Sequence, residues 1–376
     1  MADNKDKKVL NVPHLRFPEF SGEWEKYTIG DLCEEFKSGK NIKAESIQEE
    51  GVYPVFGGNG LRGYTDRYNH DGDYVLIGRQ GALCGNVRFV TGKTYITEHA
   101  IAAKATNDNY TRYLEYLFVR LNLGQFSDQS AQPGLAVNKL LKIETYVPSK
   151  AEQLKIAFLL RLLDERIATQ NKIIEDLKKL KSAIIERAYC DRSYHPYRIG
   201  DVIEQISERN KDKSIDMVLS VSNKQGFINQ SEQFEDRIIA SEDTSNYKIV
   251  HKNDFAYNPA RINVGSIARL TTIEKGIVSP MYICFRVRKE VVSEYLEHFF
   301  STSYFFYEMQ KRLEGSVRQC LSFEGICNIP IYIPSSEEQH TIGKKISVLL
   351  GKIDIETHYH FKLVEQKHYL LRQMFI

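Results

Sequence analysis

Apolar residues recur at alternating steps of three and four in two long segments of the chain. The first segment, 151–189, contains no proline or glycine, and Gln170 and Lys181 interrupt its apolar stripe. The second segment, 336–376, has the same spacing. This heptad pattern predicts two helices that pair along a narrow seam, as in a coiled coil. The expected helix-pair interface consists of Leu160, Leu163, Ile167, Ile174, Leu177, Ile184, Ile346, Leu349, Ile353, Leu363 and Leu370.

The ends of these helices also carry local signals. The first helix is expected to begin after Pro148, where Ser149 and Glu152 have the spacing of a capping box, and to be roughly 55–60 Å long. Gly343 and Gly351 weaken the second helix, so its first turns are expected to be irregular. Because a domain separates the helices in sequence, an antiparallel pair would place two domains at opposite ends. The alternative is that each helix packs on its own domain.

The two helical segments are copies of one another. The sequence VPSKAEQ at 147–153 aligns with IPSSEEQ at 333–339, and the apolar positions keep this offset of 186 residues to the end of the chain. An ungapped match over roughly 40 residues indicates an internal duplication. The segments before the helices match only at anchors such as IGDL at 29–32 and IGDV at 199–202. The duplication therefore predicts a shared frame that carries two different surfaces.

Short apolar runs between glycine-rich turns predict that both domains are α+β, each with a mainly antiparallel, barrel-like sheet. The expected strands of the first domain are 53–56, 73–77, 86–90, 94–97 and 101–104, followed by a helix at 111–123. Those of the second are 217–221, 254–257, 266–270, 276–279 and 282–287, followed by a helix near 291–312. The chain thus divides into an N-terminal tail (1–13), a first domain (14–147), a first long helix (148–190), a second domain (191–333) and a second long helix (334–376).

Composition narrows the class of protein without giving its function. The chain has 376 residues, of which 42% are hydrophobic and 27% charged, as expected of a globular protein with two or three domains. Its net charge of +2 neither demands nor excludes nucleic acid. Six scattered cysteines without a CxxC pair are typical of reduced thiols and predict a cytoplasmic protein. We expect no membrane helix and no secretory signal.

Basic and amide side chains gather in the loops of both domains. Arginine with asparagine or glutamine is the set that recognises base edges through paired hydrogen bonds, and lysine and arginine also contact phosphates. A solvated loop surface without function would look the same. The candidate DNA-binding residues are Asn59, Arg62, Arg67, Arg79, Gln80, Arg88, Lys224, Asn258, Arg261, Asn263, Arg269 and Arg318. Among these, Arg79 and Arg261 are the arginines that we expect to contact guanine.

Motifs that would indicate catalysis fail on their context. Residues 58–63, GNGLRG, match a dinucleotide-binding pattern, but no helix start follows, so a mobile turn near a phosphate backbone is preferred. The sequence NPAR at 258–261 lacks the second proline and the aromatic residue of an adenine-methyltransferase NPP[YF] motif. His358 and His360 lie on different helix faces, and no P-loop is present. We therefore expect no catalytic residue, no metal ligand and no cofactor in this chain.

Several segments match a known family. They are PHLRFPEF at 13–20, GEW at 22–24, IGDL at 29–32, LIGRQGA at 76–82, QPGL at 132–135 and, most specifically, the twice-occurring Pro-Ser-x-x-Glu-Gln motif with its helix. Over nearly its whole length the chain resembles the specificity subunits of type I restriction–modification enzymes. One departure is Leu350, where the family usually has the aspartate that this chain retains as Asp164.

This resemblance implies a function that the residue patterns alone do not give. In such proteins each domain recognises one half of a bipartite, asymmetric site in double-stranded DNA. The paired helices set the spacer and dock two methyltransferase subunits, which recruit restriction subunits. The chain would then be non-catalytic, and S-adenosylmethionine, ATP and Mg²⁺ would act in the partner subunits. The alternatives are a protein-interaction scaffold for which DNA is irrelevant, and a self-sufficient nuclease or methyltransferase.

Overall fold

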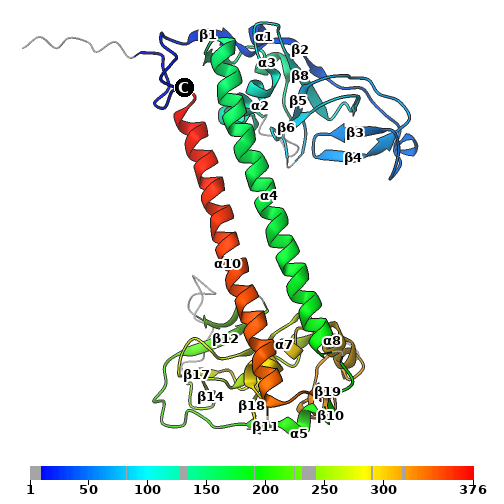
Figure 1. Ribbon diagram of the computed structural model, residues 1–376, viewed down its shortest axis with the longest axis vertical. Coiled ribbons are helices and arrows are strands. Elements are labelled where there is room, and N and C mark those ends of the chain that lie inside the picture. The colour runs from blue at the N-terminus through cyan, green and yellow to red at the C-terminus, as the bar shows by residue number, and fades with distance from the viewer. Residues whose placement is uncertain are drawn as a thin grey trace, which may run out of the picture. The chain divides into compact units, whose positions relative to one another are not determined.

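The computed structural model describes residues 10–81, 83–127, 134–189, 191–223, 225–230, 243–288, 291–315 and 319–376. They form two compact units, Met1–Asn171 with His358–Ile376, and Lys172–Thr357. Each unit contains one α+β domain and parts of both long helices, α4 (Lys150–Tyr189) and α10 (Ser336–Gln373), as Figure 1 shows. The units therefore cut across the domain boundaries that the sequence suggested, because each long helix contributes to both.

The first domain contains an antiparallel four-stranded sheet in the order β2-β8-β5-β6 and a three-stranded sheet in the order β4-β3-β7. Strands β3 and β7 are parallel, and β1 pairs with β9 directly before α4. The elements are β1 (Glu25–Thr28), α1 (Ile29–Leu32), β2 (Cys33–Ser38), η1 (Ala44–Ser46), β3 (Tyr53–Gly57), β4 (Gly60–Thr65), β5 (Tyr74–Gly78), β6 (Val87–Val90), β7 (Tyr95–Ile96), β8 (Ala100–Ala105), α2 (Thr111–Leu121), η2 (Leu123–Phe126), α3 (Val137–Leu140) and β9 (Glu144–Val147).

The second domain repeats this topology. Its sheets have the orders β11-β18-β15-β16 and β13-β12-β17-β14, with β12 and β17 parallel and β10 paired with β19. Strand β14 is an addition that the first domain's sheet does not show. The elements are β10 (His195–Arg198), α5 (Ile199–Val202), β11 (Ile203–Ile206), β12 (Val218–Ser222), β13 (Gly226–Asn229), β14 (Lys248–His251), β15 (Phe255–Tyr257), η3 (Ile262–Val264), β16 (Ile267–Arg269), β17 (Lys275–Val278), β18 (Ile283–Val287), α7 (Ser293–Phe299), α8 (Ser303–Gln310), α9 (Phe323–Cys327) and β19 (Pro330–Ile333).

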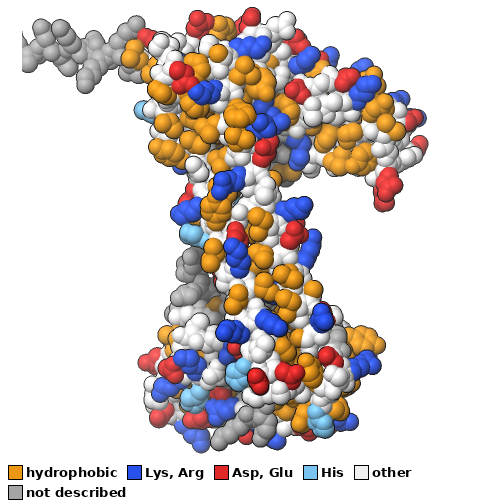
Figure 2. All heavy atoms as spheres, viewed as in Figure 1, with side chains coloured by type: hydrophobic (Ala, Val, Ile, Leu, Met, Phe, Trp, Pro, Cys, Tyr) orange, Lys and Arg blue, Asp and Glu red, His pale blue; other side chains and the backbone are white. Residues whose placement is uncertain are grey.

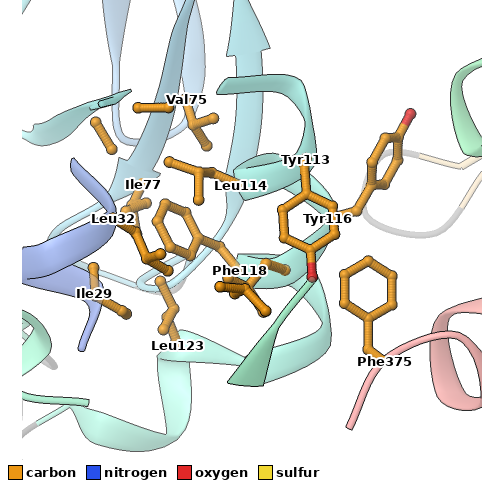
Figure 3. Close-up of a cluster of buried hydrophobic side chains, with 14 of the residues drawn as sticks. Ile29, Leu32, Val75, Ile77, Tyr113, Leu114, Tyr116, Phe118, Leu123 and Phe375 are labelled. Atoms are coloured by element: carbon orange, nitrogen blue, oxygen red, sulfur yellow. The ribbon is translucent and has the colours of Figure 1, made fainter. Parts of the chain in front are cut away.

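The core of the first unit lies between the four-stranded sheet and helix α2. All five residues of β5 are buried, as expected of a central strand that is covered on both faces. Phe375, near the end of α10, completes this core by stacking on Tyr113 of α2 with ring centroids 5.3 Å apart (Figure 3). In the second unit, Tyr189 at the end of α4 takes the corresponding place against Tyr295 of α7. Each domain core is thus closed by a residue at or just beyond the end of a long helix.

A buried glutamine ties the start of each long helix to its own domain. The side chain of Gln153 accepts a hydrogen bond from the backbone N–H of Tyr110 at 3.0 Å and donates one to the carbonyl of Pro148 at 3.0 Å. Gln339 makes the same two contacts with Val292 and Pro334, at 2.8 and 3.0 Å. Both glutamines are 1% exposed. The repeated motif therefore encodes a joint between the long helix and the domain helix before it.

The helices pair in antiparallel fashion within each unit. In the first unit, Asp164 of α4 accepts hydrogen bonds from Lys367 of α10 at 2.5 Å and from Tyr116 of α2 at 2.8 Å. In the second, Ile346 of α10 shares a buried cluster with Ile185 and Tyr189 of α4. The offset of the repeat equates Asp164 with Leu350 and Lys367 with Lys181, so the second unit replaces this polar contact with an apolar side chain.

The expected seam residues differ in burial. Among them Leu160, Leu163, Ile174, Ile346, Ile353 and Leu363 are buried, while Ile167, Leu177, Ile184, Leu349 and Leu370 are half-buried. Leu160 and Leu370 pack into the first domain's cluster, and Ile184 and Ile346 pack into the second's. The helices therefore pack on the domains as well as on each other, so the two arrangements weighed from the sequence coexist.

The helix starts differ from expectation. The carboxylate of Glu152 binds Arg16 through two hydrogen bonds of 2.8 and 2.7 Å instead of capping its own helix. The reciprocal capping bonds occur in the second copy, where Glu338 and Ser335 bind one another. Helix α10 is continuous despite its glycines. At Gly343 a methyl group would lie 3.2 Å from Glu294, so the glycine makes room for α7.

Three further expectations about the domains are wrong. The sheets do not close as a barrel among the described strands, since both domains have open strand orders. The single helix expected at 291–312 is two helices, because Thr302 caps the N-terminus of α8 by accepting from Phe305. The expected mobile turn at 58–63 is a hairpin whose second strand, β4, begins at Gly60. The remaining predicted strands were placed within one or two residues of β3, β5 to β8, β12 and β15 to β18.

Phe375→Ala should lower the free energy of unfolding by about 3–5 kcal/mol, because it removes a buried ring and leaves a cavity against Tyr113. Ile376→Ala is the matched control, since Ile376 is 40% exposed. Urea unfolding of both full-length variants measures the difference. Equal stability of the two would show that the end of α10 does not close the first domain core.

Asp164→Leu should destabilise the chain by about 1–3 kcal/mol, because the hydroxyl of Tyr116 and the ammonium of Lys367 lose their acceptor. The reverse change in the second copy, Leu350→Asp, should be neutral or stabilising by up to about 1 kcal/mol through Lys181. Thermal and urea unfolding test both. A stabilising Asp164→Leu would contradict the role given to this contact.

Candidate nucleic-acid interface

A polar hollow of about 470 Å³ opens in the first domain where three loops meet. The loops are the turn of the β3–β4 hairpin, the segment after β5 and the segment between β7 and β8. Three of the predicted residues, Asn59, Arg62 and Gln80, line it, and all three are exposed. The other lining residues are Gly57, Gly58, Gly81 and His99. The structure therefore gathers part of the predicted set around one concavity.

The backbone around this hollow is tightly packed. A methyl group at Gly58 would lie 2.7 Å from the carbonyl of His99, and one at Gly78 would lie 2.8 Å from the carbonyl of Gly58. Only glycine allows the hairpin turn to approach the end of β5 this closely. The first glycine of the segment that resembled a dinucleotide motif, Gly58, is thus explained by close contact between backbones, and the loops that carry the polar side chains are held in place.

A second hollow of about 350 Å³ lies in the second domain. Two predicted residues line it, Asn258 and Arg261. The amide oxygen of Asn258 accepts from the backbone N–H of Ala260 at 3.0 Å, while the side chain of Arg261 is exposed. Apolar and hydroxyl side chains supply most of the remaining wall, which consists of Leu219, Ser220, Val221, Gln230, Tyr247, Ser266, Ser279, Met281 and Tyr282.

The two hollows occupy equivalent places in the shared topology. In the first domain the lining comes from β3–β4, from the segment after β5 and from the segment between β7 and β8. In the second it comes mainly from β12, from the segment after β15 and from the segment between β17 and β18. The strand orders equate these elements one by one. A duplicated frame thus presents two concave surfaces that are lined by different side chains.

Two predicted arginines have internal partners instead of a free guanidinium. Arg79 donates to the carbonyl of Leu135 at 3.3 Å and to the hydroxyl of Ser38 at 3.0 Å. Arg269 donates to Glu297 at 2.8 Å and to Asn253 at 2.8 Å. Each arginine therefore holds segments of its own domain together, and the expected contact of Arg79 with guanine stays a prediction.

The other predicted residues lie away from the lining of the hollows or outside the described residues. The guanidinium of Arg67 lies over the ring of Tyr95 at 5.8 Å, beyond the far end of β4. Arg88 is exposed beside Gly60, and Asn263 is half-buried in η3. Lys224 and Arg318 fall outside the residues that the structure describes.

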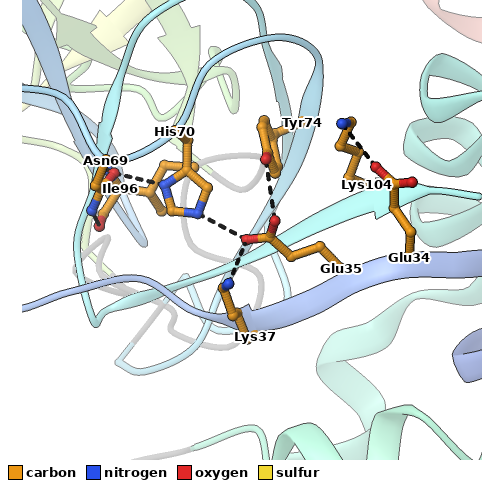
Figure 4. A network of polar contacts seen from close by, with 8 residues as sticks. All are labelled: Glu34, Glu35, Lys37, Asn69, His70, Tyr74, Ile96 and Lys104. Carbon is orange, nitrogen blue, oxygen red and sulfur yellow. Dashed lines mark hydrogen bonds and ion pairs between the residues drawn. The ribbon is translucent and has the colours of Figure 1, made fainter.

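A separate polar network lies inside the first domain (Figure 4). Glu35 accepts from Tyr74 at 3.2 Å and lies 3.1 Å from His70. Burial lowers the pKa of His70, whereas burial and the Glu35 carboxylate raise the pKa of Tyr74 to about 12. Burial alone would raise the pKa of Glu35, but its contacts with Lys37, His70 and Tyr74 hold it below its usual value. Because His70 is 7% exposed, we interpret this network as structural.

The surface charge, possible metal ligands, cysteines and helix hydropathy of the described part of the chain bear on other kinds of site. On the face seen in Figure 2, basic and acidic side chains are interspersed over both domains. The described residues contain no group of three or more histidine, cysteine, aspartate or glutamate side chains that could hold a metal ion. The five described cysteines are free. None of the helices that the structure describes is long and apolar enough to cross a membrane.

Two residues that line these hollows were not predicted from the sequence. His99 is a lone histidine with no motif around it, and its place in the wall depends on the parallel pairing of β3 with β7. Met281 is 60% exposed at the corresponding place in the second domain. Its only sequence signal is that it follows an expected strand, which is too general to single it out.

Arg79→Ala should lower the free energy of unfolding by about 1–3 kcal/mol, because the carbonyl of Leu135 and the hydroxyl of Ser38 lose a charged donor. Arg62→Ala should change it by less than about 0.5 kcal/mol, since Arg62 is exposed and makes no hydrogen bond to a described residue. Urea unfolding distinguishes the two. A neutral Arg79→Ala would contradict the structural role given to Arg79.

Comparison with known proteins identifies the family. The family model described as the type I restriction modification DNA specificity domain matches twice, at residues 21–179 and 192–363. The EcoprrI type I restriction enzyme specificity subunit of Escherichia coli is 39% identical over 173 residues, which are 45% of this chain and 42% of that protein. This chain thus matches less than half the length of that relative.

Solved structures share the fold. The type I restriction-modification S subunit from M. genitalium superposes with a TM-score of 0.66 at 19% identity, covering 97% of this chain and 99% of that one. A chain from a study of complex assembly and conformational transition of the type I R-M system superposes with a TM-score of 0.57 at 12% identity, covering 94% and 97%. The EcoprrI relative is named as a specificity subunit, in agreement with the expectation from the sequence. With both of its halves matched by the family model, the chain belongs to the type I restriction-modification DNA specificity family.

Proposed function

We propose that this chain is the DNA sequence-specificity subunit of a type I restriction–modification complex, in which each domain recognises one half of a bipartite, asymmetric site. The observation that carries the proposal is the pair of hollows at equivalent places in the two domains. The strands around the two hollows are equivalent, whereas the side chains that line the hollows differ. Recognition of two different half-sites requires this combination.

The long helices supply the spacing between half-sites. Proteins that bind two half-sites set the distance between them by their own geometry. Helices α4 and α10 have 40 and 38 residues without a break, which corresponds to roughly 55–60 Å each. The antiparallel pairing seen within each unit stiffens both helices. The length of this pair would therefore determine the number of base pairs between the recognised halves.

The helices also offer a surface for methyltransferase subunits. On the first half of α4, Leu154, Phe158 and Leu162 are 43%, 54% and 43% exposed and lie at steps of four on one face. Leu154 and Phe158 border a hollow of about 610 Å³ that Arg112 and Arg161 also line. Exposed apolar rows with arginines nearby are typical of protein interfaces. We assign this surface to a methyltransferase subunit, and further restriction subunits would join through it.

Catalysis and cofactors then reside in the partners. S-adenosylmethionine, ATP and Mg²⁺ would be bound by the methyltransferase and restriction subunits in the cytoplasm. A net charge of only +2 is compatible with DNA binding if those subunits share the phosphate contacts that dominate affinity. This chain would contribute mainly the contacts that distinguish one sequence from another.

Exchange of residues 14–147 for the same domain of another family member tests the proposal. The chimera is co-expressed with its methyltransferase subunit, and methylated adenines are mapped across the host genome. One half of the methylated site should change, while the other half and the spacer stay the same, because α4, α10 and the second domain are retained.

The reciprocal exchange of residues 191–333 is the matched control and should change only the other half. Change of both halves, or of neither, in a chimera that still directs methylation would contradict the assignment. Absence of any defined methylated site with the unaltered chain, although it assembles with the methyltransferase, would favour a scaffold without a role in DNA recognition.

A further inference from the structure

Hydrogen-bond donors dominate the hollow of the first domain. Arg62 contributes a guanidinium that makes no hydrogen bond to a described residue. Gln80 contributes an amide, and His99 contributes an imidazole. Asn59 on the hairpin turn is the remaining polar side chain of the wall. The chemistry of this surface depends on which group of the Gln80 amide is available to a ligand.

The Gln80 amide is oriented by its neighbours. Its oxygen lies 3.2 Å from Nδ1 of His99, and Nε2 of the same ring lies 3.2 Å from a carboxylate oxygen of Glu98. Both ring nitrogens thus face acceptors, and with its proton on Nδ1 the imidazole donates to the Gln80 oxygen. The contact holds the carbonyl oxygen of Gln80 against His99 and leaves its NH₂ group as the free end of the amide.

An amide held in this way cannot pair with adenine in the usual manner. Glutamine recognises adenine in the major groove with its oxygen and its NH₂ group together, whereas guanine presents two acceptors, N7 and O6. With the Gln80 oxygen engaged and the Arg62 guanidinium purely a donor, the free groups match two acceptors. Guanine is the base that shows this pattern.

We propose, on the basis of the DNA-recognition function above, that the first domain selects a guanine through Arg62 and Gln80. Glu98 and His99 are positioning residues that fix the direction of the Gln80 amide. The close backbone contact of Gly58 with the carbonyl of His99 fixes the distance between the hairpin that carries Arg62 and the loop that carries His99.

The second domain differs at the equivalent place. Its hollow has Met281, 60% exposed, at the position between strands where the first domain has His99. The amide oxygen of Asn258 is bound to its own loop, and Leu219 and Val221 add apolar wall. Among its described lining residues there is no counterpart of the Glu98–His99–Gln80 chain, so we expect the guanine selected by the first domain to lack a symmetric partner in the second half-site.

The test uses the full chain co-expressed with its methyltransferase subunit. Methylated adenines are first mapped for the unaltered chain, which gives its site. The same mapping is then carried out for Gln80→Glu and Arg62→Met. Gln80→Glu replaces the free donor with an acceptor, so one guanine of the first half-site should become cytosine, whose amino group carboxylates accept from.

Binding to synthetic duplexes then measures the contact itself. Duplexes carry the mapped site, the site with that guanine replaced by adenine, or the site with 7-deazaguanine. For the unaltered complex, adenine in place of guanine should lower the affinity about 5- to 150-fold. 7-Deazaguanine, which lacks N7 but keeps O6, should lower the affinity by a smaller factor than adenine does. Arg62→Met should remove most of this discrimination. Arg120→Met is the matched control, because Arg120 is exposed on α2 and outside the hollow, and it should keep the discrimination.

The positioning role of His99 has its own readout. His99→Ala should reduce the discrimination between guanine and adenine while leaving non-specific binding unchanged. His99→Asn should restore part of it, because the asparagine NH₂ group can take the place of Nδ1–H and hold the Gln80 oxygen. Equal effects of alanine and asparagine would contradict the positioning role.

The inference is overturned if the mapped site is unchanged in both Gln80→Glu and Arg62→Met, or if these variants lose affinity equally on all sequences, as phosphate contacts would. In either case the unaltered chain still has a defined site, so the proposed function stands. Absence of a defined site for the unaltered chain would instead overturn the proposed function, and this inference with it.

Discussion

The architecture depends on one type of contact, a buried glutamine amide at the start of each long helix. Gln153 and Gln339 each satisfy one backbone donor and one backbone acceptor where water is excluded. Glutamate at this position would lose the donor, and leucine would leave both backbone groups without a partner, at a cost of about 1–3 kcal/mol each. The amide therefore fixes the direction in which each long helix leaves its domain, and every other contact of that helix follows from this direction.

Contacts further along the helices show that the two halves have diverged in their buried contacts as well as in the hollows on their surfaces. Tyr189 donates to the carbonyl of Tyr295 and closes the second core with a hydroxyl, whereas Phe375 closes the first core with a bare ring. Asp164 has a polar role in the first unit that Leu350 cannot have in the second. The duplicated frame tolerates such changes because the glutamine joints and the strand topology are retained. Specific pairs can be exchanged around a fixed joint.

Much of this frame could be predicted from the sequence, because its signals are local. Heptad spacing and the repeated motif gave both long helices, and alternating apolar runs gave most central strands. The errors lie where distant residues decide. Residues 60–65 have the composition of a turn but form β4, since β3 supplies hydrogen-bond partners along the whole segment. Glu152 was expected to cap its own helix, but Arg16, 136 residues away, binds its carboxylate.

The candidate site was harder to predict for the same reason. The sequence singles out arginine and amide side chains in loops as a set, and their contact with DNA stays a prediction, but sequence does not tell which of them become internal. Arg79 is bound by Ser38 and Leu135, which are 41 and 56 residues away. Arg62 has no such partner in the described chain. Only the assembled loops separate the side chains that hold the frame from those that remain free for a ligand.

That separation bears on how specificity can change in a duplicated chain. Residues that hold the loops, such as Arg79 and Gly58, are costly to replace because they contact backbone carbonyls of other segments. Exposed residues such as Arg62 and Met281 can change without loss of stability. A chain built in this way can alter one recognition surface at a time while the joints, the helix pair and the other surface stay the same. An asymmetric target is therefore the expected outcome of divergence after duplication.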